Sequence, residues 1–147
     1  MGNIIAVTSD DTFRSSEYKG YGDILEAVGG RFEVQEGGRF YLNQDSDNYI
    51  NLLIYTNMEA LLIDTEKFNK VNALSCCISG KDTPYGDTAV LVDAGNGEIR
   101  GFTAEEEQAF TEWLNSIIQE QGENLALIHK EHDNRKPVHE IQYLPFE

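Results

Sequence analysis

The chain has 147 residues, with 26 acidic residues against 11 lysines and arginines and a formal net charge of -15. This length, with a 40% share of hydrophobic residues, predicts one globular domain over residues 1–147 with a core of its own. The acidic balance argues against direct nucleic-acid binding, because such binding needs cations that neutralise phosphates.

The sequence shows no sign of export or membrane insertion. No apolar run approaches the length of a membrane span, and the first residues lack the basic start and long apolar stretch of a signal peptide. Cys76 and Cys77 are neighbours, so they pair with each other only under strain and make a poor disulfide framework. We therefore expect a cytoplasmic protein without contact to a membrane, in which both thiols pack as small apolar groups.

The first part of the chain predicts a strand, a loop and a short helix. Residues 3–8 form a β-branched apolar run that is typical of a strand. Residues 9–21 are polar and without a period, so we expect a long irregular loop there. Residues 23–28 predict a short helix with Gly29 as its C-terminal cap.

The tetrapeptide Gly-Gly-Arg-Phe occurs twice, and its second copy is predicted to lie in a β-hairpin with the loop 36–38. In this register four apolar residues share one face, whereas a two-residue loop splits them between two faces. These residues are Phe32, Val34, Phe40 and Leu42. Gly38 is expected to take the left-handed conformation that such loops need at their third position.

The middle of the chain alternates apolar runs with turns. Residues 49–56 predict a buried strand, followed by a turn at 57–59 and a further β segment at 60–63. A short helix is expected over residues 64–70. Residues 72–79 fit either an extension of that helix or a strand, because short apolar runs do not distinguish the two.

Beyond residue 84, the sequence predicts two strands at 88–93 and 98–102, joined by a glycine-rich turn, and then the clearest helix of the chain at 103–121. Thr103 and Glu106 form a Thr-x-x-Glu capping box at its start. Its apolar residues recur at helical spacing and are expected to pack on the sheet. No lysine or arginine occurs in this helix.

These elements predict the α+β class: a mostly antiparallel sheet of hairpins with the helix 103–121 packed on one face. The core is expected to span about residues 1–122. Residues 123–147 are interpreted as a C-terminal extension, with a helix or strand at 125–128 and a last edge strand at 138–144.

No motif in the sequence indicates catalysis or a cofactor. Nucleophile-elbow, P-loop, Rossmann and zinc-protease patterns are missing. A loop from Asp93 resembles a calcium-binding EF-hand loop, but Glu98 replaces its sixth-position glycine and Ala104 its twelfth-position glutamate. The three histidines, within residues 129–139, lack a completing ligand pattern. We expect no catalytic residue, no metal and no cofactor, so the protein is interpreted as non-enzymatic.

Three segments resemble one known family. They are LEAVGGRFE (25–33), LLIYTNMEALLI (52–63) and GDTAVLVDAGNGEIRGFTAEE (86–106). They are similar to a family of small proteins of unknown function that occurs in phages, plasmids and Gram-positive gut bacteria. That family often has Glu-Gly at the turn where this chain has Asn57-Met58-Glu59. The resemblance implies a mobile-element setting and no catalytic residue.

Together these features favour a small acidic binding protein that contacts a basic surface of a host protein, as an inhibitor of a defence or restriction protein would. The expected contact is an acidic face on the helix 103–121, formed by Glu105, Glu106, Glu107, Glu112 and Glu120. The alternative is a sponge or sensor that binds an anionic nucleotide. Its candidate contacts are Arg14, Lys19, Arg31 and Arg39.

Overall fold

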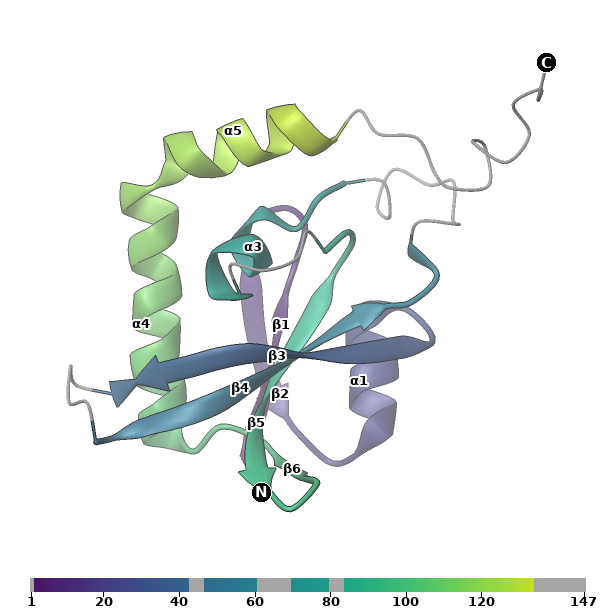
Figure 1. Ribbon diagram of the computed structural model, residues 1–147, viewed down its shortest axis with the longest axis vertical. Coiled ribbons are helices and arrows are strands. Elements are labelled where there is room, and N and C mark those ends of the chain that lie inside the picture. Colours follow the sequence, from purple (N-terminus) through teal and green to yellow (C-terminus); the bar gives the residue numbers. More distant parts are fainter. Residues whose placement is uncertain (1, 43–46, 61–69, 80–83, 134–147) are drawn as a thin grey trace.

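The computed structural model describes residues 2–42, 47–60, 70–79 and 84–133. They form an antiparallel sheet in the order β2–β1–β5–β4–β3, with β6 paired to β5 (Figure 1). The strands are β1 (Asn3–Val7), β2 (Phe13–Glu17), β3 (Phe32–Tyr41), β4 (Tyr49–Asn57), β5 (Thr88–Gly95) and β6 (Glu98–Arg100). The helices are α1 (Tyr21–Val28), α3 (Ala73–Ser79), α4 (Ala104–Glu120) and α5 (Gly122–His132). The α+β fold predicted from the sequence is confirmed.

Helices cover both faces of this sheet, and the core is divided accordingly. α1 packs on one face, here called the α1 face, while α3, α4 and α5 contribute to the core on the other, here called the α4 face. Alternate residues of β1 pack in different cores: Ile4 and Ala6 point to the α1 face, and Ile5 and Val7 point to the α4 face. The sheet is therefore a central layer between helices.

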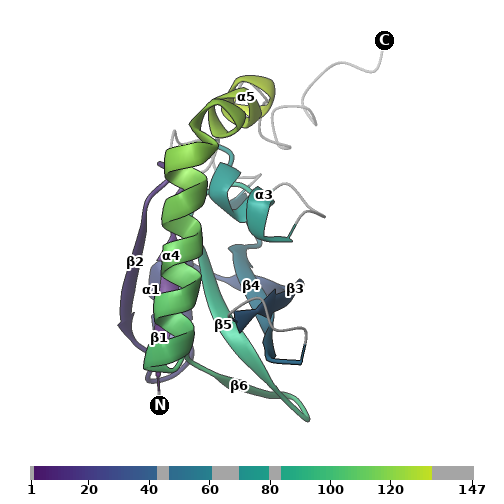
Figure 2. The ribbon, with the colours of Figure 1, turned by 90° about the vertical axis from the view of Figure 1, so that its left-hand side faces the viewer.

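α4 and α5 form an angled pair, as Figures 1 and 2 show. α4 lies along the sheet, and α5 follows it directly and turns away at a steep angle. Phe110 and Leu114 of α4 are fully buried, and Leu125 of α5 joins them in the same core cluster. α5 thus shares the core of the domain. None of the described helices is long and apolar enough to cross a membrane.

The hairpin predicted around Gly37 is wrong. β3 continues through this position for 10 residues and pairs along its length with β4. A β-bulge lies at Gly37, between the pairs Glu36–Leu53 and Gly38–Leu52. Gly38 has the expected left-handed backbone, with φ of 84°. A Cβ atom on Gly37 would lie 3.0 Å from Leu52 and Ile54, so the bulge needs glycine where its backbone meets β4.

The hairpin prediction failed because it assumed that only one face of the strands is buried. The bulge leaves Phe32 and Val34 on the α1 face and moves Phe40 to the α4 face, where its ring meets Phe110. Since helices cover both faces, Phe32 and Phe40 each pack against a core on their own face, whereas Val34 remains 52% exposed.

The long loop predicted at residues 9–21 is also wrong, because it contains β2, which pairs with β1 along the sheet edge. The tight turn between them uses Asp11 in a left-handed conformation, with φ of 62°, and a hydrogen bond of 2.6 Å between the Thr8 and Thr12 hydroxyls. Four of the five residues of β2 are exposed. A polar edge strand of this kind lacks the apolar alternation that predicts a strand.

The remaining elements follow the predictions where the structure describes them. The strands expected at 3–8, 49–56 and 88–93 correspond to β1, β4 and β5, and the helix at 103–121 to α4. The ambiguous segments 72–79 and 125–128 are both helical, in α3 and α5. The elements predicted at 60–63, 64–70 and 138–144 fall mostly or wholly outside the described residues.

Candidate functional site

The exposed side of α4 carries acidic residues, and the helix itself contains no lysine or arginine. This helix has 17 residues, and its exposed carboxylates include Glu105, Glu112 and Glu120, here called the acidic stripe. Glu105 and Glu112 are seven positions apart and therefore lie on the same side of the helix, two turns from each other. Within this stripe, Gln108 Nε2 donates a hydrogen bond of 3.3 Å to Glu112 Oε1.

Two of the five predicted contact residues do not belong to this stripe. Glu106 is only 8% exposed, and its carboxylate accepts hydrogen bonds of 2.7 and 2.9 Å from the two terminal nitrogens of Arg100. It also completes the capping box, accepting a bond of 2.9 Å from the Thr103 backbone N–H. Glu107 is half-buried and accepts a bond of 2.6 Å from Asn3 Nδ2. Both residues fasten the start of α4 to the sheet.

The ion pair with Arg100 lowers the pKa of Glu106 below the ordinary value of 4.5, and the Thr103 backbone N–H contributes in the same direction. A lowered pKa in the folded state stabilises the fold above the unfolded-state pKa, and this stabilisation is lost as the pH falls through the folded-state value. Glu106→Gln is therefore expected to lower the free energy of unfolding by about 1–2 kcal/mol at neutral pH. Urea unfolding at neutral pH and below pH 4.5 measures this loss.

Glu105→Gln is the matched control, because Glu105 is exposed and lies beside Glu106 in the first turn. It is expected to change stability by less than about 0.5 kcal/mol. The difference in the free energy of unfolding between wild type and Glu106→Gln should become smaller in acid, because the protonated Glu106 is then as neutral as the glutamine. A stability difference between wild type and Glu106→Gln that is as large in acid as at neutral pH would contradict the stabilising role of the Glu106 carboxylate.

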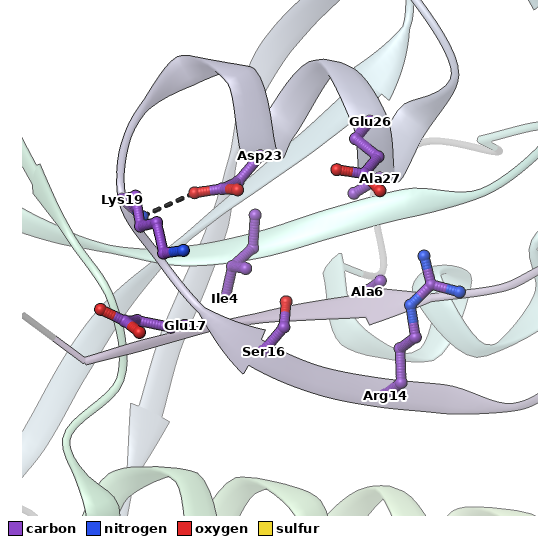
Figure 3. A pocket seen from close by; sticks show the side chains of 9 residues that line it. All are labelled: Ile4, Ala6, Arg14, Ser16, Glu17, Lys19, Asp23, Glu26 and Ala27. Carbon is purple, nitrogen blue, oxygen red and sulfur yellow. Dashed lines mark hydrogen bonds between the residues drawn. The ribbon is translucent and has the colours of Figure 1, made fainter.

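Two of the four predicted cationic contacts meet in one cleft of about 520 Å³ between β2 and α1. Figure 3 shows Arg14 extending from β2 towards α1, with Lys19 at the other end of the cleft. Three carboxylates, those of Glu17, Asp23 and Glu26, line the same cleft. The formal charges of the lining residues therefore do not favour an anion on balance.

The carboxylate of Asp23 in this cleft has a local structural role. Its Oδ2 accepts hydrogen bonds of 2.6 Å from the Lys19 backbone N–H and 3.2 Å from that of Gly20. These bonds stabilise the turn that leads into α1. Arg31 and Arg39 do not line the cleft. The guanidinium of Arg39 instead lies 4.4 Å from the centre of the Tyr49 ring, on the β3–β4 pair.

His129 forms a polar contact that the sequence did not reveal. Its Nδ1 lies 2.9 Å from Asp133 Oδ2, and its Nε2 lies 3.0 and 3.1 Å from the two carboxylate oxygens of Asp11. Asp133 in turn accepts a bond of 2.8 Å from the Val71 backbone N–H. This contact joins α5 to the β1–β2 turn and to the start of α3. The spacing His-x-x-x-Asp on a helix signals the first pair, but nothing in the sequence signals Asp11.

No catalytic arrangement emerges among the described residues. Burial raises the pKa of Cys76 to about 11 and also raises that of Cys77, so both thiols stay protonated at neutral pH and are poor nucleophiles. Both are free cysteines that are half-buried, as the sequence predicted. Within residues 2–42, 47–60, 70–79 and 84–133, no group of three or more potential ligand residues is placed to hold a metal ion.

Comparison of the chain with models of protein families, with curated proteins and with solved structures gives no match.

Proposed function

We propose that the protein is a non-enzymatic binding protein whose acidic stripe on α4 contacts the basic surface of a partner protein. The observation that carries this proposal is a 17-residue helix without lysine or arginine, exposing Glu105, Glu112 and Glu120 on a chain of net charge -15. A negative electrostatic potential attracts a positively charged partner and accelerates the association of the two proteins. The packing of α4 on the sheet holds these carboxylates on a rigid element.

The resemblance to phage and plasmid proteins supports a mobile-element setting for this binding. In that setting the partner is a host protein, and inhibition of a defence or restriction protein is the form of action that we propose. Proteins that act on nucleic acids carry the basic surfaces that an acidic stripe fits. The proposed inhibitor acts by covering such a surface, which needs no catalytic residue of its own.

Capture from bacterial host lysate tests this proposal when wild type is compared with the double variant Glu105→Lys/Glu112→Lys. We expect mass spectrometry to find a basic protein that wild type retains at low salt and that the variant loses. The control Glu59→Lys/Glu98→Lys makes the same change in net charge at exposed positions outside α4 and should retain the partner. Equal capture by all three proteins would contradict a contact through the acidic stripe.

The second candidate function is binding of an anionic nucleotide in the cleft between β2 and α1. The observation in its favour is that Arg14 and Lys19 both line this one cleft. A nucleotide that binds the folded state raises the melting temperature. Such a rise should disappear in Arg14→Ala/Lys19→Ala and persist in Arg31→Ala/Arg39→Ala. Unchanged melting temperatures with mono-, di- and triphosphates would contradict this alternative.

A further inference from the structure

β3 lies at an edge of the sheet, and in the part of the chain that the structure describes no strand pairs with its outer side (Figure 2). It is also the longest of the described strands, with 10 residues. The unpaired N–H and C=O groups of an edge strand are a template for pairing with another strand.

The hydrogen bonds to β4 show which backbone groups of β3 point outward. In an antiparallel pair, hydrogen-bonded and non-bonded residue pairs alternate. Met58 N–H donates to Arg31 C=O at 3.0 Å, directly before β3. By alternation, the backbone groups of Phe32, Val34 and Glu36 therefore point away from β4.

The same alternation of backbone groups holds beyond the bulge. Leu42 N–H donates to Asn48 C=O at 2.8 Å, directly after the last residue of β3. The backbone groups of Arg39 and Tyr41 therefore also point outward. The bulge shifts the alternation by one residue, so that the outward positions are even-numbered before it and odd-numbered after it.

The side chains at the outward positions are complementary to one another. Val34 and Tyr41 are 52% and 44% exposed, and Glu36 and Arg39 are exposed residues of opposite charge. All four lie on the α1 face, because they pair with alternate residues of β4, two of which, Leu53 and Tyr55, belong to the core on that face. In one antiparallel register, the residue numbers of every facing pair add up to the same value. The pairs 34–41 and 36–39 share this value, so a single register brings both pairs together.

We propose that β3 pairs antiparallel with β3 of a second copy of this chain, about a two-fold axis between Gly37 and Gly38. Glu36 then lies opposite Arg39 of the second copy, and Val34 opposite Tyr41, each pair occurring twice by symmetry. Opposite charges and an aliphatic–aromatic pair are favourable cross-strand neighbours. The bulge makes this self-pairing possible, since without it residues 34 and 41 would point to opposite faces.

The dimer is expected to be weak and to tighten as salt is added at low ionic strength. Pairing along one strand edge covers less surface than the roughly 1,200 Å² of a stable interface, so a dissociation constant on the order of 100 µM is expected. Two chains of net charge -15 repel each other, and about 0.15 M salt shortens that repulsion to about 8 Å. Binding through the acidic stripe has the opposite salt dependence, which separates the two proposals.

Sedimentation velocity over protein concentrations from about 5 to about 500 µM tests the dimer. Wild type is expected to shift from monomer to dimer over this range. Arg39→Glu and Glu36→Arg each place like charges opposite each other and should weaken the dimer at least about tenfold. The exchange Glu36→Arg/Arg39→Glu restores opposite charges and should restore association to within about threefold of wild type.

Arg31→Glu is the matched control, because it makes the same charge change at an exposed residue before β3 and should leave the dimer intact. Arg39→Glu also removes the contact with the Tyr49 ring, so Glu36→Arg, which keeps that contact, must weaken the dimer as well. Circular dichroism checks that each variant is folded. A monomer at every concentration, or an exchange variant that associates no better than the single variants, would overturn the proposal.

Discussion

Replacing Asn72 with alanine is expected to lower the free energy of unfolding by about 4 kcal/mol. Asn72 is fully buried before α3. Its Nδ2 donates to the carbonyls of Val7 at 2.8 Å and Gly86 at 2.9 Å, and its Oδ1 accepts from the Ser75 N–H at 3.0 Å. Alanine removes all three bonds and leaves the Val7 carbonyl only a longer bond of 3.4 Å from the Thr88 hydroxyl. A buried polar group that loses its partner costs about 1–3 kcal/mol. Urea unfolding measures the loss.

Two further variants make this experiment specific. Asn115→Ala removes an exposed asparagine from α4 and is expected to change stability by less than about 0.5 kcal/mol. Asn72→Asp keeps an acceptor for Ser75 but removes both donated bonds, so it should destabilise the protein at least as much as alanine does. A loss below about 1 kcal/mol for Asn72→Ala would mean that water satisfies the exposed carbonyls and that Asn72 does not hold β1 to α3.

Phe110→Ala is expected to have an equally large effect, about 4 kcal/mol, because it opens a cavity at the centre of the α4 face. The side chain is fully buried, and its ring centre lies 5.1 Å from that of Phe102 and 5.2 Å from that of Phe40. Trp113 packs against it at 5.7 Å. Chemical denaturation monitored by tryptophan fluorescence reports both the stability and the state of this aromatic cluster.

Phe110→Leu is the matched control, since leucine keeps most of the apolar volume and should cost less than about 2 kcal/mol. The difference between the two variants isolates the cavity from the loss of ring contacts. If alanine and leucine destabilise the protein equally, the aromatic geometry matters more than the filled volume. If neither destabilises it, α4 does not pack on the sheet through Phe110, which would contradict the fold.

The elements that the sequence predicts correctly are those whose residue pattern lies within the element itself. α4 has both a capping box and an apolar stripe at helical spacing, and β1, β4 and β5 are apolar runs with turn residues between them. β3 and β2 depend on partners elsewhere in the chain. The course of β3 follows from cores on both faces of the sheet, and β2 is a polar strand that only pairing with β1 makes regular.

The same distinction applies to the candidate site. The acidic character of α4 is visible in the sequence, because a run without lysine or arginine needs no partner to be recognised. That Glu106 turns inward depends on Arg100, which the capping box alone does not indicate. The contact between His129 and Asp11 joins residues 118 positions apart, and that between Asn72 and Val7 joins residues 65 positions apart. Such contacts arise from the assembled fold and leave no pattern in the chain.

The most direct test of the account is the affinity of the captured partner for wild type and for Glu105→Lys/Glu112→Lys, measured by calorimetry at about 50 mM and about 500 mM salt. A contact through the acidic stripe predicts that high salt and the double variant each weaken binding by at least about tenfold. It also predicts that the variant loses most of the salt dependence. An affinity that neither salt nor the two lysines change would contradict the proposed function.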